Sequence, residues 1–247
     1  MYTRLIYIVR IFILFTCASL NAQDVELVWE ENFNGSDLEM ASWNFETGDG
    51  CPLLCGWGNN ERQIYTKKNH RVKDGLLYIS AKKEGDRYTS SKITTQGKKE
   101  FQYGKIELRA KLPLGKGLWP AFWMLGSNTK SVGWPRCGEI DILEYVGKEP
   151  EYIFTSLHTP ASHGKTINTR KDRVEGIEEG FHTYAINWSA ESIEFLIDGN
   201  SFYTFSPKIK NEEIWPFDKP FYMILNLAIG GNFGGPEVDD SIFPQEF

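Results

Sequence analysis

The chain has 247 residues, which is long enough for one large domain. Its 27 Lys and Arg residues are outnumbered by 33 Asp and Glu residues, which gives a net charge of −6. This acidic balance argues against nucleic acid as a partner and, more weakly, against sulfated polysaccharides, because both are polyanions. A neutral substrate fits the composition better.

The first 22 residues have the pattern of a secretory signal peptide. Arg4 and Arg10 make the start basic, residues 11–20 form an apolar run, and Ala22 is a small residue at the boundary. A membrane anchor is the alternative, but the run is shorter than the roughly 20 apolar residues that a spanning helix needs. We therefore expect cleavage near Ala22 and a secreted protein, extracellular or periplasmic, with no membrane attachment.

Residues 23–247 contain no linker or internal repeat and are predicted to form one domain and a monomer. Without the two arginines of the leader, 25 basic residues face 33 acidic ones, a charge of −8. Cys51 and Cys55 lie four residues apart in a loop-like segment, which predicts a local disulfide in an exported protein. A metal-binding pair is the alternative. Cys137 would then be an unpaired, buried thiol.

Short runs with a period of two recur along the chain and end at Gly, Asn, Asp or Pro. They predict β-strands over residues 75–81, 104–111, 183–188 and 193–198. Asp198-Gly199-Asn200 has the composition of a hairpin turn after the last of these. Few windows show helical periodicity. The sequence therefore predicts an all-β fold of two packed antiparallel sheets.

Eight tryptophans raise the aromatic content to 14%. Four of them lie next to predicted strands and are expected in the core: Trp29, Trp43, Trp188 and Trp215. The other four lie among polar residues, and their rings could stack on the apolar faces of sugars or simply pack: Trp57, Trp119, Trp123 and Trp134.

The segment 138–147, Gly-Glu-Ile-Asp-Ile-Leu-Glu-Tyr-Val-Gly, contains three acids in a strand pattern. Glu139 and Asp141 alternate with apolar residues, but Glu144 has the opposite parity and would point into the core. A buried, unpaired glutamate costs several kcal/mol. A one-residue β-bulge at Ile142 or Leu143 would return Glu144 to the acidic face, and we predict that bulge.

Three acids on one strand face favour a catalytic site over the alternative, an edge strand whose charges prevent aggregation. Two carboxyl groups held about 5–5.5 Å apart are the machinery of retaining glycosidases. A calcium or two-metal site is less suited to parallel side chains of one strand. His158 is isolated in sequence, and we expect it to hydrogen-bond a sugar hydroxyl. Motifs for a serine nucleophile, for phosphate and for an organic cofactor are absent from the sequence.

This acidic segment resembles the active-site strand of the laminarinase-type enzymes of glycoside hydrolase family 16. Further motifs follow in the order of that family, and the likeness covers nearly all of residues 23–247: Trp57-Gly-Asn-Asn-Glu61, Gly117-Leu-Trp-Pro-Ala-Phe-Trp-Met-Leu-Gly126, Gly133-Trp-Pro135, Phe181-His-Thr-Tyr184 and Asn226-Leu-Ala-Ile-Gly-Gly231.

The resemblance implies a β-jelly-roll sandwich with a substrate cleft across its concave sheet. It implies that Glu139 is the nucleophile, Asp141 an assisting acid and Glu144 the general acid/base. The two residues between Asp141 and Glu144 are similar to the bulged strand of β-1,3-glucanases. Other positions match residues that contact sugar or support the catalytic strand in the family: Asn59, Glu61, Trp119, Trp123, Trp134, His158 and Asn226.

Two departures from the family pattern bear on binding. Lys92 and Lys105 stand where the family often has arginine, whose planar fork lysine lacks. The sequence ends at Phe247, before the strand that usually supplies an aspartate to a structural calcium, whereas the expected carbonyl donors near Glu31 and Gly75 are present. Calcium binding is therefore left open.

The predicted activity is retaining endo-hydrolysis of internal β-1,3 linkages in glucans such as laminarin. The alternatives are a mixed-linkage β-1,3-1,4-glucanase and a β-glucan-binding domain that does not hydrolyse. Retention of all three acids favours an enzyme.

Overall fold

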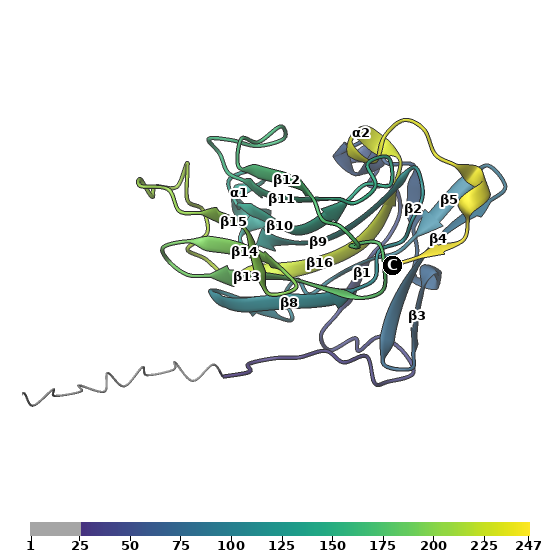
Figure 1. The fold of residues 1–247 in the computed structure, drawn as a ribbon, viewed down its shortest axis with the longest axis horizontal. Helices are drawn as coiled ribbons and strands as arrows, with labels where there is room; N and C mark the ends of the chain where they lie inside the picture. Colours follow the sequence, from purple (N-terminus) through teal and green to yellow (C-terminus); the bar gives the residue numbers. More distant parts are fainter. Residues whose placement is uncertain (1–25) are drawn as a thin grey trace, which may run out of the picture. The chain divides into compact units, whose positions relative to one another are not determined.

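Figure 1 shows the fold as a computed structural model, which describes residues 26–247. The predicted signal peptide, residues 1–22, lies outside these described residues. The chain divides into two units, one that ends at Glu31 and one from Asn32 to Phe247, and the β-sheets all belong to the second unit. In the described part of the chain, no helix has both the length and the apolar character needed to cross a membrane.

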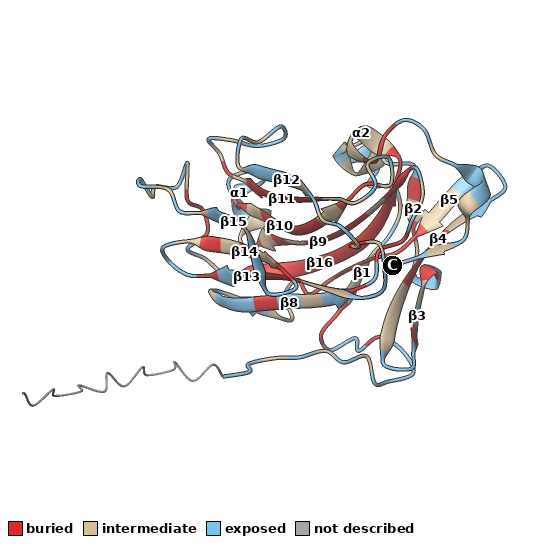
Figure 2. Ribbon diagram, in the orientation of Figure 1, coloured by how far each residue is buried: buried red, intermediate tan, exposed pale blue. Residues whose placement is uncertain are grey.

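The largest sheet has eight antiparallel strands in the order β1–β6–β16–β9–β10–β11–β12, with β7 paired to β16. Its strands are β1 (Asn44–Glu46), β6 (Lys92–Thr94), β7 (Glu100–Phe101), β9 (Leu118–Gly126), β10 (Glu139–Tyr145), β11 (Tyr152–His158), β12 (Thr169–Arg173) and β16 (Phe221–Ile229). Strand β16 is buried along its whole length, and β9, β10 and β11 are mostly buried, as the red segments of Figure 2 show.

A second antiparallel sheet packs against the first and has the order β15–β14–β13–β8. Its strands are β8 (Gly104–Ala110), β13 (His182–Trp188), β14 (Ile193–Ile197) and β15 (Asn200–Phe205). Trp188 of β13 meets Phe221 of β16 edge-on, with ring centroids 5.3 Å apart, and so connects the two sheets. The predicted all-β sandwich is confirmed.

A third sheet of five strands was not predicted. It has the order β17–β4–β5–β2, with β3 paired to β4, and its β2–β5 pair is parallel. Its strands are β2 (Gln63–Tyr65), β3 (His70–Lys73), β4 (Leu76–Glu84), β5 (Arg87–Ser90) and β17 (Gln245–Glu246). The short helices are η1 (Cys55–Gly58), η2 (Lys67–Asn69), α1 (Thr129–Val132), α2 (Gly231–Gly234) and η3 (Asp240–Ile242).

Local sequence signals agree with this architecture. The four predicted strand segments correspond to β4, β8, β13 and β14. The predicted hairpin turn joins β14 to β15, with φ of 48° at Asp198 and 75° at Gly199, as a turn with two left-handed residues requires. Of the tryptophans expected in the core, Trp43, Trp188 and Trp215 are buried. Trp29 is only half-buried, so its assignment to the core was wrong.

Candidate active site

The acidic strand β10 contains the predicted bulge. Asp141 lies opposite Ser156 of β11 and Glu144 lies opposite Phe154, so two residues of β10 face one of β11 between them. The register against β9 shifts at the same place. The bulge therefore turns Glu144 to the face that carries Glu139 and Asp141, and the burial of a glutamate in the core is avoided.

All three acids line one groove on the large sheet, with a volume of about 260 Å³. Five of the seven residues predicted to bind or support substrate also line it, namely Asn59, Glu61, Trp119, Trp123 and Asn226. The remaining lining residues are Glu46, Leu54, Trp57, Tyr65, Lys92, Ala121 and Leu125. Trp134 and His158 lie beside the groove rather than in its lining.

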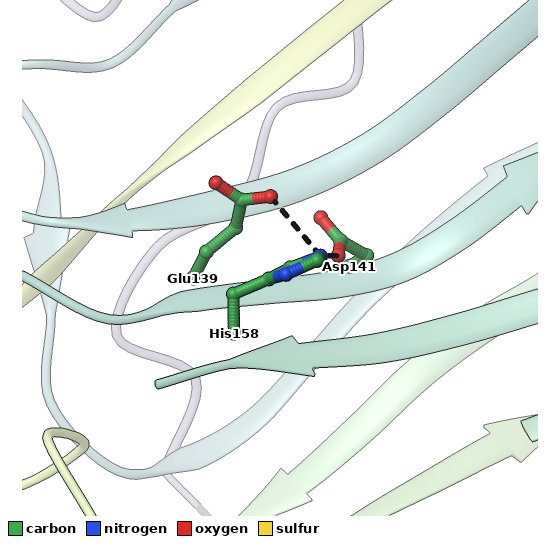
Figure 3. Close-up of side chains that lie close together, drawn as sticks. All are labelled: Glu139, Asp141 and His158. Carbon is green, nitrogen blue, oxygen red and sulfur yellow. Dashed lines mark ion pairs between the residues drawn. The ribbon is translucent and has the colours of Figure 1, made fainter. Parts of the chain in front are cut away.

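His158 lies directly across from Glu139, on β11, and points at the carboxylates (Figure 3). Its Nε2 atom is 3.1 Å from Oδ2 of Asp141 and 3.6 Å from Oε1 of Glu139. The backbone N–H of Gly164 donates to Nδ1 at 3.1 Å, so Nδ1 is the acceptor and a neutral ring carries its proton on Nε2. The Nε2 side of His158 therefore faces Asp141, but this contact lacks hydrogen-bond geometry, and the buried Oδ2 of Asp141 has no hydrogen-bond partner among the described residues. The expected contact of His158 with a sugar hydroxyl stays a prediction.

Glu139, Asp141 and His158 place donor atoms within 4.8 Å of one another, which is compact enough for a metal ion. A metal on Nε2 would need a free lone pair there, and therefore a proton on Nδ1. That proton would face the Gly164 N–H, and the hydrogen bond to Nδ1 would be lost. The donor set does not fit a metal, and the arrangement is better suited to holding and moving protons.

Burial dominates the electrostatics of the three acids. Desolvation, together with the charge of Asp141, raises the pKa of Glu139 to about 8, while His158 and a hydrogen bond from Trp134 oppose the rise. Desolvation raises the pKa of Asp141 to about 8. Desolvation and the neighbouring acids raise the pKa of Glu144 well above its usual range. Glu144 is therefore suited to keeping a proton near neutral pH, as a general acid must.

Two groove tryptophans donate hydrogen bonds from their indoles. Nε1 of Trp119 donates to Oε1 of Glu144 at 3.1 Å, and Nε1 of Trp123 donates to Oδ1 of Asn226 at 2.7 Å. Trp134 is 48% exposed, and its ring lies 5.9 Å from that of His158 and 5.2 Å from that of His163. An exposed ring held beside the acids can still stack on a sugar.

The loop before β2 reaches the groove and is closed by a disulfide between Cys51 and Cys55. This bond leaves neither thiol free for the alternative metal pair. Leu54 and Trp57 of this loop line the groove. From the sequence alone, the role of Trp57 was left open and Leu54 was not considered. Cys137 is a free, buried cysteine, as expected.

The two lysines at family arginine positions differ in location. Lys92 lies in the groove, forms a 2.7 Å ion pair with Glu46 and lies over the rings of Trp57 and Trp123, at 4.3 and 5.1 Å. Lys105 is exposed on β8 of the other sheet and pairs with Glu107 at 2.7 Å. Only Lys92 can therefore affect binding in the groove, and a role for Lys105 is not supported.

Comparison with known proteins identifies the family. Residues 58–239 match the model of the glycosyl hydrolases family 16. A glucan endo-1,3-beta-glucosidase of Cryptopygus antarcticus is 43% identical over 234 residues, covering 87% of this chain and 84% of its own. A beta-glucanase of Rhodothermus marinus is 39% identical over 239 residues, covering 90% and 82%. The crystal structure of a laminarinase from Flavobacterium sp. UMI-01 is similar with a TM-score of 0.88 at 68% identity, covering 90% of this chain and 96% of that one. The chain belongs to the glycosyl hydrolases family 16.

Proposed function

We propose that this protein is a retaining endo-glycosidase that hydrolyses internal β-1,3 linkages of glucans such as laminarin. The observation that carries the proposal is the bulged strand β10, which brings Glu139, Asp141 and Glu144 into one groove. The names of the similar proteins, a glucan endo-1,3-beta-glucosidase and a laminarinase, support this substrate. An acidic groove lined by tryptophans also suits a neutral sugar chain.

The mechanism assigns one role to each of the two catalytic glutamates. The Glu139 carboxylate attacks the anomeric carbon, and Glu144 gives its proton to the departing glycosidic oxygen, which leaves a glycosyl ester on Glu139. Glu144 then takes a proton from water, the water oxygen attacks the anomeric carbon, and the Glu139 carboxylate is released. Two displacements at one carbon restore its original configuration, so the product keeps the β configuration.

His158 prepares Glu139 for this role, whereas the charge of Asp141 opposes the ionisation of Glu139. His158 points its Nε2 proton at Asp141 and lies 3.6 Å from Glu139, so the imidazole favours the ionised form of the nucleophile. His158 also lowers the pKa of Glu144, which lies opposite Phe154 and accepts a hydrogen bond from Trp119. The two catalytic glutamates therefore differ in their side-chain hydrogen-bond donors, Trp134 for Glu139 and Trp119 for Glu144.

Product analysis tests this function. The purified protein is incubated with laminarin, lichenan and agarose, and soluble oligosaccharides are separated by length over time. We expect a ladder of oligosaccharides from laminarin at early times. Cleavage of lichenan without laminarin would indicate the mixed-linkage alternative, and binding to laminarin with no products would indicate a recognition domain.

We also propose secretion, which residues 1–22 support by their pattern and the Cys51–Cys55 disulfide by its need for an oxidising compartment. Expression of the full chain with a C-terminal tag, followed by N-terminal sequencing of protein from the medium or periplasm, tests this. We expect a start near Gln23. Retention of the tag in the membrane or cytoplasm would contradict it.

A structural calcium ion is a further proposal. The side-chain oxygen of Asn34 and the backbone oxygen of Asn32 converge on Gly75, each within 4 Å of the place where its Cβ would be. Neutral oxygens of this kind fit part of a calcium shell of six to eight donors. We expect calcium to raise the melting temperature by a few degrees relative to EDTA, without a role in the reaction. Equal melting temperatures would contradict this.

A further inference from the structure

A directional series of hydrogen bonds links four residues that line the groove. Trp123 of β9 donates from Nε1 to Oδ1 of Asn226 at 2.7 Å. The amide Nδ2 of Asn226, on β16, donates to the hydroxyl of Tyr65 at 3.1 Å, and that hydroxyl donates to Oε2 of Glu61 at 3.3 Å. Three bonds thus connect Trp123 to the carboxylate of Glu61, and all four residues line the groove.

The donors and acceptors of these hydrogen bonds allow only one direction for the series. An indole nitrogen is only a donor, so it requires the oxygen of Asn226, and the Asn226 amide must then offer its N–H groups to Tyr65. The Tyr65 hydroxyl uses its oxygen for that bond and its proton for Glu61. If Asn226 lost Tyr65 as an acceptor, its amide could rotate and turn an N–H group toward the Trp123 indole. The orientation of the Trp123 ring therefore depends on the acceptor at the other end.

Glu61 is firmly held as this acceptor. Oε2 also accepts from Nε2 of Gln63 at 2.6 Å, and Oε1 accepts from Nδ2 of Asn59 at 3.3 Å. Gln63 is anchored in turn, because its side-chain oxygen accepts from the backbone N–H of Ile229 at 2.7 Å. The oxygens of Glu61 are thus engaged by protein donors, although the family resemblance placed Glu61 and Asn59 among residues that contact sugar or support the catalytic strand.

Trp123 is the member of this hydrogen-bond series that lies beside the catalytic acids. It lies opposite Asp141 in the β9–β10 register, and its half-buried ring lines the groove beside the acids. By contrast, Tyr65 and Asn226 are 2% and 6% exposed. A change at Tyr65 can therefore affect sugar binding chiefly through its neighbours.

We infer that Glu61 and Tyr65 are positioning residues that fix the Trp123 indole in the groove through Asn226. This inference rests on the proposed function, since it assumes that Trp123 meets the glucan. It differs from a direct sugar contact by Glu61, and it differs from a general structural role, because the effect should pass through one ring.

A double-mutant cycle tests this path. Tyr65→Phe removes one hydroxyl from the middle of the chain and keeps the ring, and we expect kcat/KM on laminarin to fall about tenfold, the usual loss for one buried hydrogen bond. In a Trp123→Phe background, Tyr65→Phe should lower kcat/KM by less than about twofold. The ring at position 123 then has no N–H group for Asn226 to accept from, so the loss of the Tyr65 hydroxyl no longer affects its position. Equal losses in both backgrounds would overturn the inference.

Substitutions at Glu61 separate its role as a hydrogen-bond acceptor from the role of its negative charge. Glu61→Gln keeps an oxygen for Tyr65 and should stay within about threefold of the wild type, whereas Glu61→Met removes the acceptor and should lose about tenfold. If Glu61→Gln lost as much as Glu61→Met, a role for the charge itself would replace the positioning role. Tyr184→Phe is the matched control, since Tyr184 is equally buried on β13 of the other sheet, and it should leave kcat/KM unchanged.

The outcomes also separate this inference from the proposed function. If the wild-type protein does not cleave laminarin, the proposed function fails. If the wild type cleaves laminarin and the Tyr65 and Trp123 effects add, only the positioning role fails. Melting temperatures of all variants identify any loss that comes from unfolding.

Discussion

The indole N–H of Trp119 donates a 3.1 Å hydrogen bond to the carboxyl group of Glu144, the proposed general acid/base. Burial and the neighbouring acids raise the pKa of Glu144, while this hydrogen bond lowers it. The tryptophan thus keeps a buried acid able to release its proton, which a residue that acts first as acid and then as base requires.

Replacement of Trp119 by Phe should therefore shift the alkaline limb of the kcat/KM profile upward. The variant loses a donor to the carboxylate but keeps a ring, so Glu144 should hold its proton to higher pH. We expect a shift of about half a pH unit or more, measured on laminarin from pH 5 to 10. Trp123→Phe is the control, because the Trp123 indole donates to Asn226 rather than to Glu144. The alkaline limb of the kcat/KM profile of this variant should stay in place. A downward shift for Trp119→Phe would contradict the assignment of Glu144.

The two catalytic glutamates should be separable from binding. Glu139→Ala and Glu144→Gln are each expected to lower kcat on laminarin by about 10³-fold or more, because each removes a covalent or proton-transfer role. Oligosaccharide affinity, measured by calorimetry, should change by less than about threefold. Glu107→Gln, an exposed acid on the other sheet, is the control and should keep full activity. Near-normal rates in either glutamate variant would refute its role.

Stability should depend on pH through Glu139. Its pKa rises from 4.5 in the unfolded chain to about 8 in the fold, so the folded state binds the proton more tightly. The stabilising effect of that proton is complete below pH 4.5 and is lost as the pH rises toward 8. Glu139→Gln lacks this titration. We expect its melting temperature to equal that of the wild type at pH 4 and to exceed it by about 5 °C or more at pH 8. An equal difference at both pH values would contradict the pKa shift.

His158 should influence the reaction through the contact between its Nε2 atom and Asp141. His158→Ala leaves the buried Oδ2 of Asp141 without its neighbour at 3.1 Å, and we expect kcat/KM to fall by about 10-fold to 100-fold. His158→Gln offers an N–H group in a similar place and should recover part of the loss. The comparison requires kcat and KM for both variants on laminarin. If Gln and Ala were equally impaired, the imidazole would have a role beyond the contact between Nε2 and Asp141.

The sequence predicted those parts of the site that depend on local pattern. Glu144 could be assigned to the acidic face because it lies five positions after Glu139, and only a bulge reconciles that spacing with a buried apolar face. The hairpin at Asp198-Gly199 and the strands around it likewise follow from composition and a period of two.

The parts that sequence reasoning missed depend on pairing between distant strands. The position of His158 follows from the β10–β11 register, and that of Lys105 from its membership of β8 in the second sheet. The path from Glu61 to Trp123 crosses three strands from two sheets, and no spacing in the sequence reveals it. The third sheet, with a parallel pair between β2 and β5, requires the same long-range information.

The anomeric configuration of the first products tests the central claim most directly. A laminari-oligosaccharide is hydrolysed in an NMR tube, and the anomeric proton signals are recorded before mutarotation. Glu139 as nucleophile and Glu144 as acid/base predict that the β-anomer forms first and the α-anomer appears only as mutarotation proceeds. If the α-anomer formed first, water would have attacked directly, and a covalent ester on Glu139 would be ruled out.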